Sequence, residues 1–487
     1  MIKYQCSGWL KYKKGSSDLR GFTYTYDDSG NITKVVTAGT KVPKAATLKE
    51  YGYDAQGQLV SEKNGSGTTF LYAYDTAGNI RSITKDGTVT KSFGYTNPSW
   101  PDLLTSVTAN GTTKDVLYEG QSQTSDLPSS GNPVTYYNGR DYHFDWSKGR
   151  QLTEAVVGGQ TVKYAYDMAG VRSSKQVGDT TYSYATLSGK VMRQAWGDNN
   201  ALEFVYDDSS QPFAVIYKHG SAAELYYYLV NAQGDVAAIL DSSGTMVAFY
   251  DYDAWGNCTV YNSSAKVLTD PTSIANINPL RYRGYYYDAE TGFYYLQSRY
   301  YDPAICRFIN ADTFATTDAN GFLSANMFAY CENNPIMLVD QDGGVPVIIA
   351  GALIGGLVGA ISGALSSALQ GGDKSEIMAG ALSGMVTGFV AGVVSTAAPI
   401  LAAALDVSGV AMLGAASAVS GAVGTLSSAL SQKSTKGKVD WGEAVLNGGL
   451  TAIDTFASRG VGIIARGSGI GTAVCTTCLL YTSDAAD

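Results

Sequence analysis

The feature that most constrains the fold of this chain is a short unit, Tyr-x-Tyr-Asp-x-x-Gly, that recurs through its first half. Tyrosines two positions apart project from the same face of a β-strand. The aspartate can accept a backbone N–H two residues on, and the glycine supplies the positive φ angle that closes a turn. Each unit therefore predicts a strand, a turn and the next strand. The clear copies are Tyr24-Thr-Tyr26-Asp27 with Gly30, Tyr51-Gly-Tyr53-Asp54 with Gly57, Tyr72-Ala-Tyr74-Asp75 with Gly78, and Tyr164-Ala-Tyr166-Asp167 with Gly170.

Looser copies occur at residues 144–150 and 252–257, and Tyr118-Glu119 begins a copy that a polar insert at residues 121–130 interrupts. A single hairpin cannot bury its own apolar face, so successive hairpins must stack or wind into a continuous sheet. The 35 Tyr and 56 Gly are typical of many short strands joined by glycine turns. We therefore expect a mainly β fold, with a spiral of hairpins over residues 1–280.

Composition limits the classes of function. The 34 Lys and Arg residues against 43 Asp and Glu give a net charge of -9, which argues against broad contact with a phosphate backbone. Nucleic acid is therefore not expected as a partner of this portion. The chain has only two histidines, His143 and His219, both in the repeat region. No zinc-ligand or Ser/His pattern accompanies them, so we expect neither a metal site nor a cofactor.

Residues 281–343 carry the most specific string of the chain, with the segments RYRGYYYDAETGFYYLQSRYYDP, RFINAD and NMFAYCENNPIMLVDQDG. On this string and the repeats, the chain resembles the RHS-repeat family, also called YD-repeat proteins. The resemblance implies a hollow β-cocoon that an RHS core, residues 281–344, closes as a plug. It also implies a secreted or surface-exposed bacterial carrier whose partner is its own C-terminal effector, often a toxin.

In several relatives an aspartyl-type self-cleavage cuts the chain after the core. By position, Asp312 of RFINAD corresponds to an aspartate implicated in that reaction, and Asp318 is a weaker candidate. Peptide hydrolysis by carboxyl groups needs two of them close enough to share a proton. Each aspartate of this region could instead serve a turn, and Gln341 stands where relatives more often have proline. The expected cleavage region comprises Asp340, Asp342, Gly343 and Gly344.

Several arginines lie among the tyrosines of residues 281–343. Arginines in such surroundings usually stack on aromatic rings or pair with turn aspartates. We therefore expect structural roles for Arg281, Arg283, Arg299 and Arg307.

After Gly344 the sequence changes to Gly, Ala, Val, Leu, Ile and Ser, and tyrosine is absent until Tyr481. Glycines at four-residue spacing on a helix form a groove along which another helix can pack closely. Residues 345–430 therefore predict apolar α-helices, either inserted into a target-cell membrane or packed as a buried hairpin. The two glycine series are Gly351, Gly355, Gly359 and Gly363, then Gly380, Gly384, Gly388 and Gly392.

The two ends of the chain call for separate interpretations. Residues 431–477 resemble the start of a variable C-terminal region, whereas residues 478–487, CLLYTSDAAD, match a translated sequencing adapter and are excluded from the fold. The N-terminus has no apolar stretch of signal-peptide length and enters the repeats directly, so we expect the repeat region to be N-terminally incomplete.

Two functions remain open. The first is the carrier portion of a polymorphic toxin, with at most an autoprotease activity on its own chain near residue 344. The second is a cell-surface adhesive protein whose tyrosine rings bind surface glycans. A short effector domain after Thr477 would favour the first, and glycan binding by the repeats would favour the second.

Overall fold

The computed structural model describes residues 7–14, 17–39, 41–121, 128–207, 210–312, 326–344 and 347–348. The chain divides into two units, Met1–Pro346 and Val347–Asp487. Asp318, both glycine series and residues 431–487 lie outside the described residues, so the expectations for them stay predictions. Within the described part of the chain, no helix has the length and apolarity needed to cross a membrane.

Two large antiparallel sheets make up most of the first unit, and in both the strands follow one another in sequence order. The prediction of a mainly β protein is therefore confirmed. The ten-stranded sheet contains β1 (Ser7–Lys14), β2 (Ser17–Tyr26), β3 (Ile32–Ala38), β4 (Leu48–Tyr53), β5 (Leu59–Asn64), β6 (Thr69–Tyr74), β7 (Ile80–Lys85), β8 (Thr88–Gly94), β9 (Ser106–Ala109) and β10 (Thr112–Asp115), with the 3-10 turn η1 (Lys44–Thr47) before β4.

The fourteen-stranded sheet continues the same pattern of neighbours joined by short turns. It contains β11 (Leu117–Tyr118), β12 (Pro133–Tyr137), β13 (Asp141–Ser147), β14 (Gln151–Val157), β15 (Gln160–Tyr166), β16 (Arg172–Val177), β17 (Thr180–Leu187), β18 (Lys190–Trp196), β19 (Asn200–Tyr206), β20 (Pro212–His219), β21 (Ala222–Val230), β22 (Val236–Asp241), β23 (Met246–Tyr252) and β24 (Cys258–Asn262).

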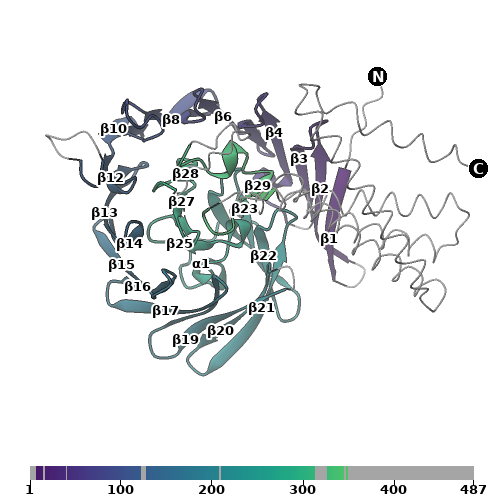
Figure 1. Cartoon of the computed structure of the whole chain (residues 1–487). Helices are drawn as coiled ribbons and strands as arrows, with labels where there is room; N and C mark the ends of the chain where they lie inside the picture. The colour runs from purple at the N-terminus through teal and green to yellow at the C-terminus, as the bar shows by residue number, and fades with distance from the viewer. Residues whose placement is uncertain are drawn as a thin grey trace, which may run out of the picture. The chain divides into compact units, whose positions relative to one another are not determined.

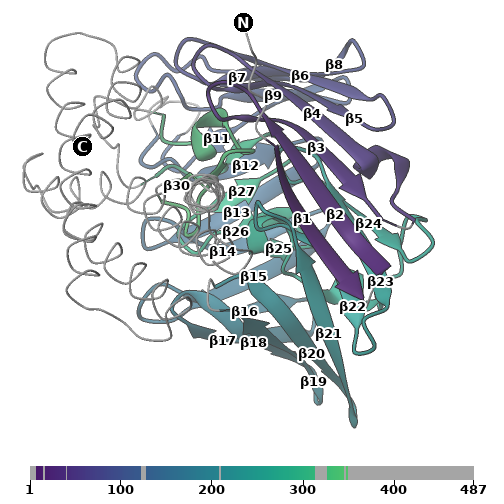
Figure 2. The ribbon, with the colours of Figure 1, turned by 90° about the vertical axis from the view of Figure 1, so that its right-hand side faces the viewer.

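The two sheets curve around a common interior, and their ends meet. Figure 1 shows the strands following an arc, and Figure 2 shows β1 and β2 beside β22 to β24. At this seam Ala46 of η1 packs with Leu229, Ala238 and Phe249 of the last strands. Lys49 of β4 also forms an ion pair with Asp251 of β23, at 3.2 Å. The hairpins therefore form one curved wall, in which the first strands pack against the last through these side-chain contacts.

The described residues of the segment that follows the wall, 281–312 and 326–343, lie inside the arc (Figure 1). We call it the core segment. Its large side chains are almost fully buried, among them Tyr282, Tyr294, Tyr301 and Tyr330. The short helix α1 (Ile274–Ile277) precedes it. Its elements are η2 (Tyr282–Gly284), a four-stranded sheet of β25 (Tyr286–Asp288), β26 (Phe293–Tyr295), β27 (Tyr300–Asp302) and β28 (Arg307–Phe308), then η3 (Cys331–Asn333) and β29 (Leu338–Val339). The strand β30 (Val347–Ile348) belongs to the second unit.

Candidate functional site

The repeat residues build the turns of the wall. At the first copy, Asp27 Oδ1 accepts hydrogen bonds from the backbone nitrogens of Ser29, at 2.9 Å, and Asn31, at 2.8 Å. Gly30 lies at φ +85°, a conformation that costs a residue with a Cβ atom but not glycine. The carboxylate therefore replaces solvent as partner of two backbone donors. The same pair of bonds forms at Asp54, Asp75 and Asp167, with Gly57, Gly78 and Gly170 at positive φ.

The second tyrosine of each copy links consecutive turns. Tyr53 donates its hydroxyl hydrogen bond to the carbonyl oxygen of Ile32, just past the preceding turn, at 2.7 Å. Tyr74 does the same to Leu59 at 2.7 Å. The sequence indicated an aromatic pair on one face but not this bond, because the acceptor is a backbone carbonyl of another repeat. Most of these rings are thus engaged within the wall, and Tyr166 and Tyr206 bind the Leu152 and Val191 carbonyls in the same way.

The repeat pattern did not predict several turns of the same kind, because no tyrosine pair precedes them. The signal that would have found them is an Asn or Asp with glycine three residues on. Asn64, Asn231 and Asp241 each accept hydrogen bonds from the backbone nitrogens two and four residues later. In the interrupted copy, Glu119 takes the place of the aspartate and accepts from the Asn132 side chain at 2.8 Å.

Buried ion pairs attach the core segment to the wall. Asp288 of β25 binds both Arg172 of β16, at 2.5 Å, and Lys175, at 3.1 Å. Arg283 pairs with Asp235 of the wall at 3.0 Å. These contacts fit the structural roles expected for the arginines of the core segment. Arg299 differs from them, because it lies beside the expected cleavage region.

Arg299 brings two of the candidate aspartates together. Its Nη2 lies 3.1 Å from Asp312 Oδ2 and 3.3 Å from Asp340 Oδ2. The guanidinium group stacks 3.6 Å from the centre of the Phe308 ring and is almost fully buried. Burial lowers the pKa of Arg299, and the two carboxylates partly oppose this. Asp340 is thereby the carboxyl group that shares a cation with Asp312.

The peptide bond between Gly343 and Gly344 lies against this group. Asp340 Oδ1 accepts hydrogen bonds from both backbone nitrogens, at 2.8 and 2.9 Å. Arg299 donates from Nε to the Gly343 carbonyl oxygen and from Nη2 to that of Gly344, the latter at 3.2 Å. Burial raises the pKa of Asp340, while Arg299 lowers it and Asp342 raises it further. A carboxyl group of this kind keeps its proton to higher pH than an exposed one.

Gly343 cannot carry a side chain here. It lies at φ +79°, and a Cβ atom would fall 2.8 Å from the Leu296 carbonyl oxygen and 2.7 Å from Ser298 Oγ. Asp342 is exposed, and its Oδ1 accepts from the Gly344 nitrogen at 3.2 Å, as a turn residue does. The structure therefore brings Asp312, Asp340 and Gly343 together and leaves Asp342 at the rim.

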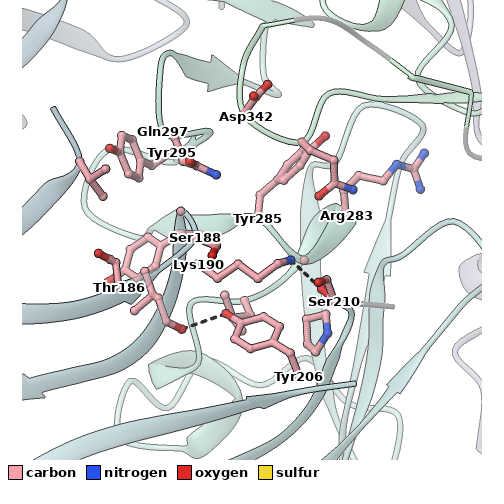
Figure 3. A pocket seen from close by; sticks show the side chains of 18 of the residues that line it. Thr186, Ser188, Lys190, Tyr206, Ser210, Arg283, Tyr285, Tyr295, Gln297 and Asp342 are labelled. Atoms are coloured by element: carbon pink, nitrogen blue, oxygen red, sulfur yellow. Dashed lines mark hydrogen bonds between the residues drawn. The ribbon is translucent and has the colours of Figure 1, made fainter. Parts of the chain in front are cut away.

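A pocket of about 450 Å³ has Gln341 and Asp342 in its lining, whereas Asp340, Gly343 and Gly344 are not among the residues that line it. Hydroxyl and amide groups line it, and Figure 3 shows Tyr206, Lys190 and Gln297 around the space with Asp342 at one wall. Lys190 donates from its ammonium group to the Ser210 carbonyl oxygen at 2.6 Å. Because a water molecule occupies about 30 Å³ of liquid, the pocket can hold several beside Asp342. Two carboxyl groups, a polarising cation and water are the components of peptide hydrolysis.

Metal chemistry receives no support from the described residues, where no group of three or more His, Cys, Asp or Glu side chains is arranged to hold an ion. His143 lies 4.0 Å from Asp145, and His219 lies 3.3 Å from Glu224; both histidines are partly exposed on the wall. Neither lies at the pocket beside Asp342.

Similarity to known proteins covers the wall and most of the core segment. The tRNA3(Ser)-specific nuclease WapA of Bacillus spizizenii is 35% identical over 302 residues, which are 60% of this chain and 12% of WapA. The double-stranded DNA deaminase toxin A of Burkholderia cenocepacia is 28% identical over 217 residues, 39% of this chain and 14% of that protein. This chain thus spans about an eighth of the length of these relatives.

Solved structures of TcdB2-TccC3 complexes also match. The TcdB2-TccC3-Cdc42 crystal structure aligns with a TM-score of 0.49 at 20% identity and covers 68% of this chain and 17% of that one. The family model described as Teneurin YD-shell matches residues 9–336, more than half of the chain. The chain therefore belongs to the Teneurin YD-shell family of YD-repeat proteins.

Proposed function

We propose that this chain is the carrier portion of a secreted polymorphic toxin that encloses its own C-terminal effector. The relatives support this: one is named a tRNA nuclease, another a DNA deaminase toxin and a third a toxin subunit, YenC2 of Yersinia entomophaga. Proteins with such different activities share the region that this chain matches. The change of composition after Gly344 marks the point where the effector side of the chain begins.

The second part of the proposal is self-cleavage between Gly343 and Gly344. The observation that carries it is that Asp340 and Arg299 both hydrogen-bond to this peptide, while Arg299 also pairs with Asp312. In the reaction, Asp312 takes a proton from a water molecule that attacks the Gly343 carbonyl carbon. Asp340 Oδ1 accepts a hydrogen bond from the Gly344 N–H at 2.9 Å. Asp340 supplies its own proton to the lone pair that this nitrogen gains when the carbonyl carbon becomes tetrahedral, and the bond then breaks. Arg299 holds both carboxyl groups and polarises the carbonyl.

The pH dependence follows from the raised pKa of Asp340. The acid must be protonated to donate, and burial keeps it protonated to higher pH than an exposed aspartate. Cleavage should therefore slow as pH rises through that pKa. A pH–rate profile of the full chain measures this directly.

The experiment is expression of the full chain followed by intact mass measurement and N-terminal sequencing. We expect a new N-terminus at Gly344. Asp312→Asn and Asp340→Asn should each slow cleavage by at least about 100-fold, because each removes one partner of the acid–base pair. Asp179→Asn, on an exposed hairpin tip, is the matched control and should cleave normally.

Asp318→Asn separates the two candidate pairings. If Asp312 acts with Asp340, this variant cleaves at the wild-type rate. Loss of cleavage in Asp318→Asn with normal cleavage in Asp340→Asn would move the second carboxyl role to Asp318. A folded wild-type chain that stays intact refutes the self-cleavage proposal.

No second function gains comparable support. Glycan binding needs exposed aromatic faces, whereas Tyr24, Tyr72 and Tyr164 of the repeats are buried. Membrane insertion of residues 345–430 is still a proposal based on the sequence pattern, since all of that segment except residues 347–348 lies outside the described residues.

A further inference from the structure

The loop between β26 and β27 lies directly against the peptide bond proposed to be cut. Ser298 donates its backbone N–H to the Asp342 carbonyl oxygen at 3.0 Å. Its side-chain Oγ lies 2.7 Å from that oxygen and 2.7 Å from the Gly343 carbonyl oxygen. The hydroxyl has one hydrogen for these two acceptors, and Asp342 has a second donor in the Ser298 N–H, which also lies 2.6 Å from the Leu296 carbonyl oxygen. Arg299 Nε donates to the same Gly343 oxygen.

We propose that the Ser298 hydroxyl is a catalytic oxyanion donor in the self-cleavage. This inference rests on the proposed cleavage between Gly343 and Gly344. When water attacks, negative charge develops on the Gly343 carbonyl oxygen, where the hydroxyl and the guanidinium of Arg299 already converge. Donors held about 2.7 to 3.1 Å from such an oxygen lower the barrier because they need no reorganisation during the reaction.

The surrounding structure fixes this contact in place. Gly343 has no space for a Cβ atom against the loop, so its carbonyl cannot retreat without moving the backbone. Gln297, at φ +60°, turns the chain so that Ser298 faces the peptide. The tip of the β17–β18 hairpin lies close to this loop, since a Cβ atom added at Gly189 would fall 2.2 Å from Gln297 Oε1.

The step balances as a simple hydrolysis with water as co-reactant. The water oxygen bonds to the Gly343 carbonyl carbon, and the bond from that carbon to the Gly344 nitrogen breaks. One water proton passes to Asp312, and the proton of Asp340 passes to the leaving nitrogen. Ser298 forms no covalent bond and keeps its proton, which hydrogen-bonds the oxyanion until the carbonyl of the new Gly343 carboxylic acid re-forms.

The test is the cleavage rate of full-length Ser298→Ala against Ser298→Thr. Loss of the hydroxyl should slow cleavage on the order of 100-fold, the effect of removing one oxyanion donor elsewhere. Threonine keeps a hydroxyl and should retain most of the rate. Ser221→Ala, on the exposed tip of the β20–β21 hairpin, is the matched control and should cleave normally.

The pH–rate profile separates a catalytic from a structural role. Ser298→Ala should lower the rate at every pH without moving the profile, because the two carboxyl groups keep their surroundings. A profile that moves, or a threonine variant as slow as the alanine variant, assigns Ser298 to structure and overturns the inference. Wild-type cleavage with Ser298→Ala equally fast also overturns it, while the proposed function stands. A wild-type chain that does not cleave refutes both.

Discussion

Replacing Glu62 by glutamine should make the stability of the protein less dependent on pH. Glu62 of β5 is 1% exposed and lies at the seam where the first strands meet the last. Its Oε2 accepts from the Ala254 nitrogen at 2.8 Å, and its Oε1 lies 3.7 Å from Lys49 without a hydrogen bond. Lys49 also forms an ion pair with Asp251, at 3.2 Å. One cation thus faces several buried carboxyl groups.

The magnitude follows from the pKa of Glu62. Burial raises it from 4.5 to about 7, although Lys49 opposes the rise. Above pH 4.5 the unfolded chain releases this proton while the folded chain retains it, so folding becomes less favourable as pH increases. The loss is complete above about pH 7. At about 1.4 kcal/mol for each tenfold change in proton affinity, the total is about 3 kcal/mol.

The assay is urea unfolding of the full chain and of Glu62→Gln at several pH values between 4.5 and 8. Fluorescence of Trp255, whose ring lies 5.6 Å from that of Tyr72 at the seam, reports on this region. Loss of the carboxylate also changes the free energy of unfolding of the variant by an amount that does not depend on pH. The informative quantity is therefore how the difference in unfolding free energy between the two proteins changes with pH. It should move in favour of the variant by about 3 kcal/mol.

Asp251 and Asp253 also have pKa values raised by burial, and both remain in the variant. Both charges also raise the pKa of Glu62, so the protonation of these two carboxyl groups changes when Glu62 is replaced. The difference between the two proteins therefore measures the whole group of interacting carboxyls. Parallel stability curves for the two proteins across this pH range would refute the reasoning, because they would mean that Glu62 takes up no more protons in the folded chain than in the unfolded one.

Two further substitutions test the contacts that hold the wall and the core segment. Asp288→Asn leaves Arg172 and Lys175 buried without their shared carboxylate, so it should lower the free energy of unfolding by about 3 to 5 kcal/mol. A loss below about 1 kcal/mol in urea unfolding would contradict the role of this ion pair. Tyr74→Phe removes the hydroxyl bond to Leu59 and should cost about 1 kcal/mol in the same assay, and an unchanged midpoint would show that this bond adds nothing to stability.

The sequence determined the local geometry of the wall. The turn at Asp27 needs only a carboxylate, two backbone donors within four residues and a glycine, so its hydrogen bonds can be predicted without knowing the fold. The order of the strands follows as well, because turns this short join only antiparallel neighbours. The tyrosine pairs predicted which face of the sheet is buried. They did not predict the turn at Asn64, which forms the same hydrogen bonds without a preceding tyrosine pair.

Only the tertiary structure decided which carboxyl groups meet. Asp312 could be named from its motif, whereas Asp318 was only a weak candidate on sequence nearness and lies outside the described residues. Arg299 links Asp312 to Asp340 because the β26–β27 loop and the end of the core segment pack together, and such contacts depend on the path of the whole chain. The raised pKa of Glu62 has the same origin, since a charge becomes costly only when distant strands exclude water from it.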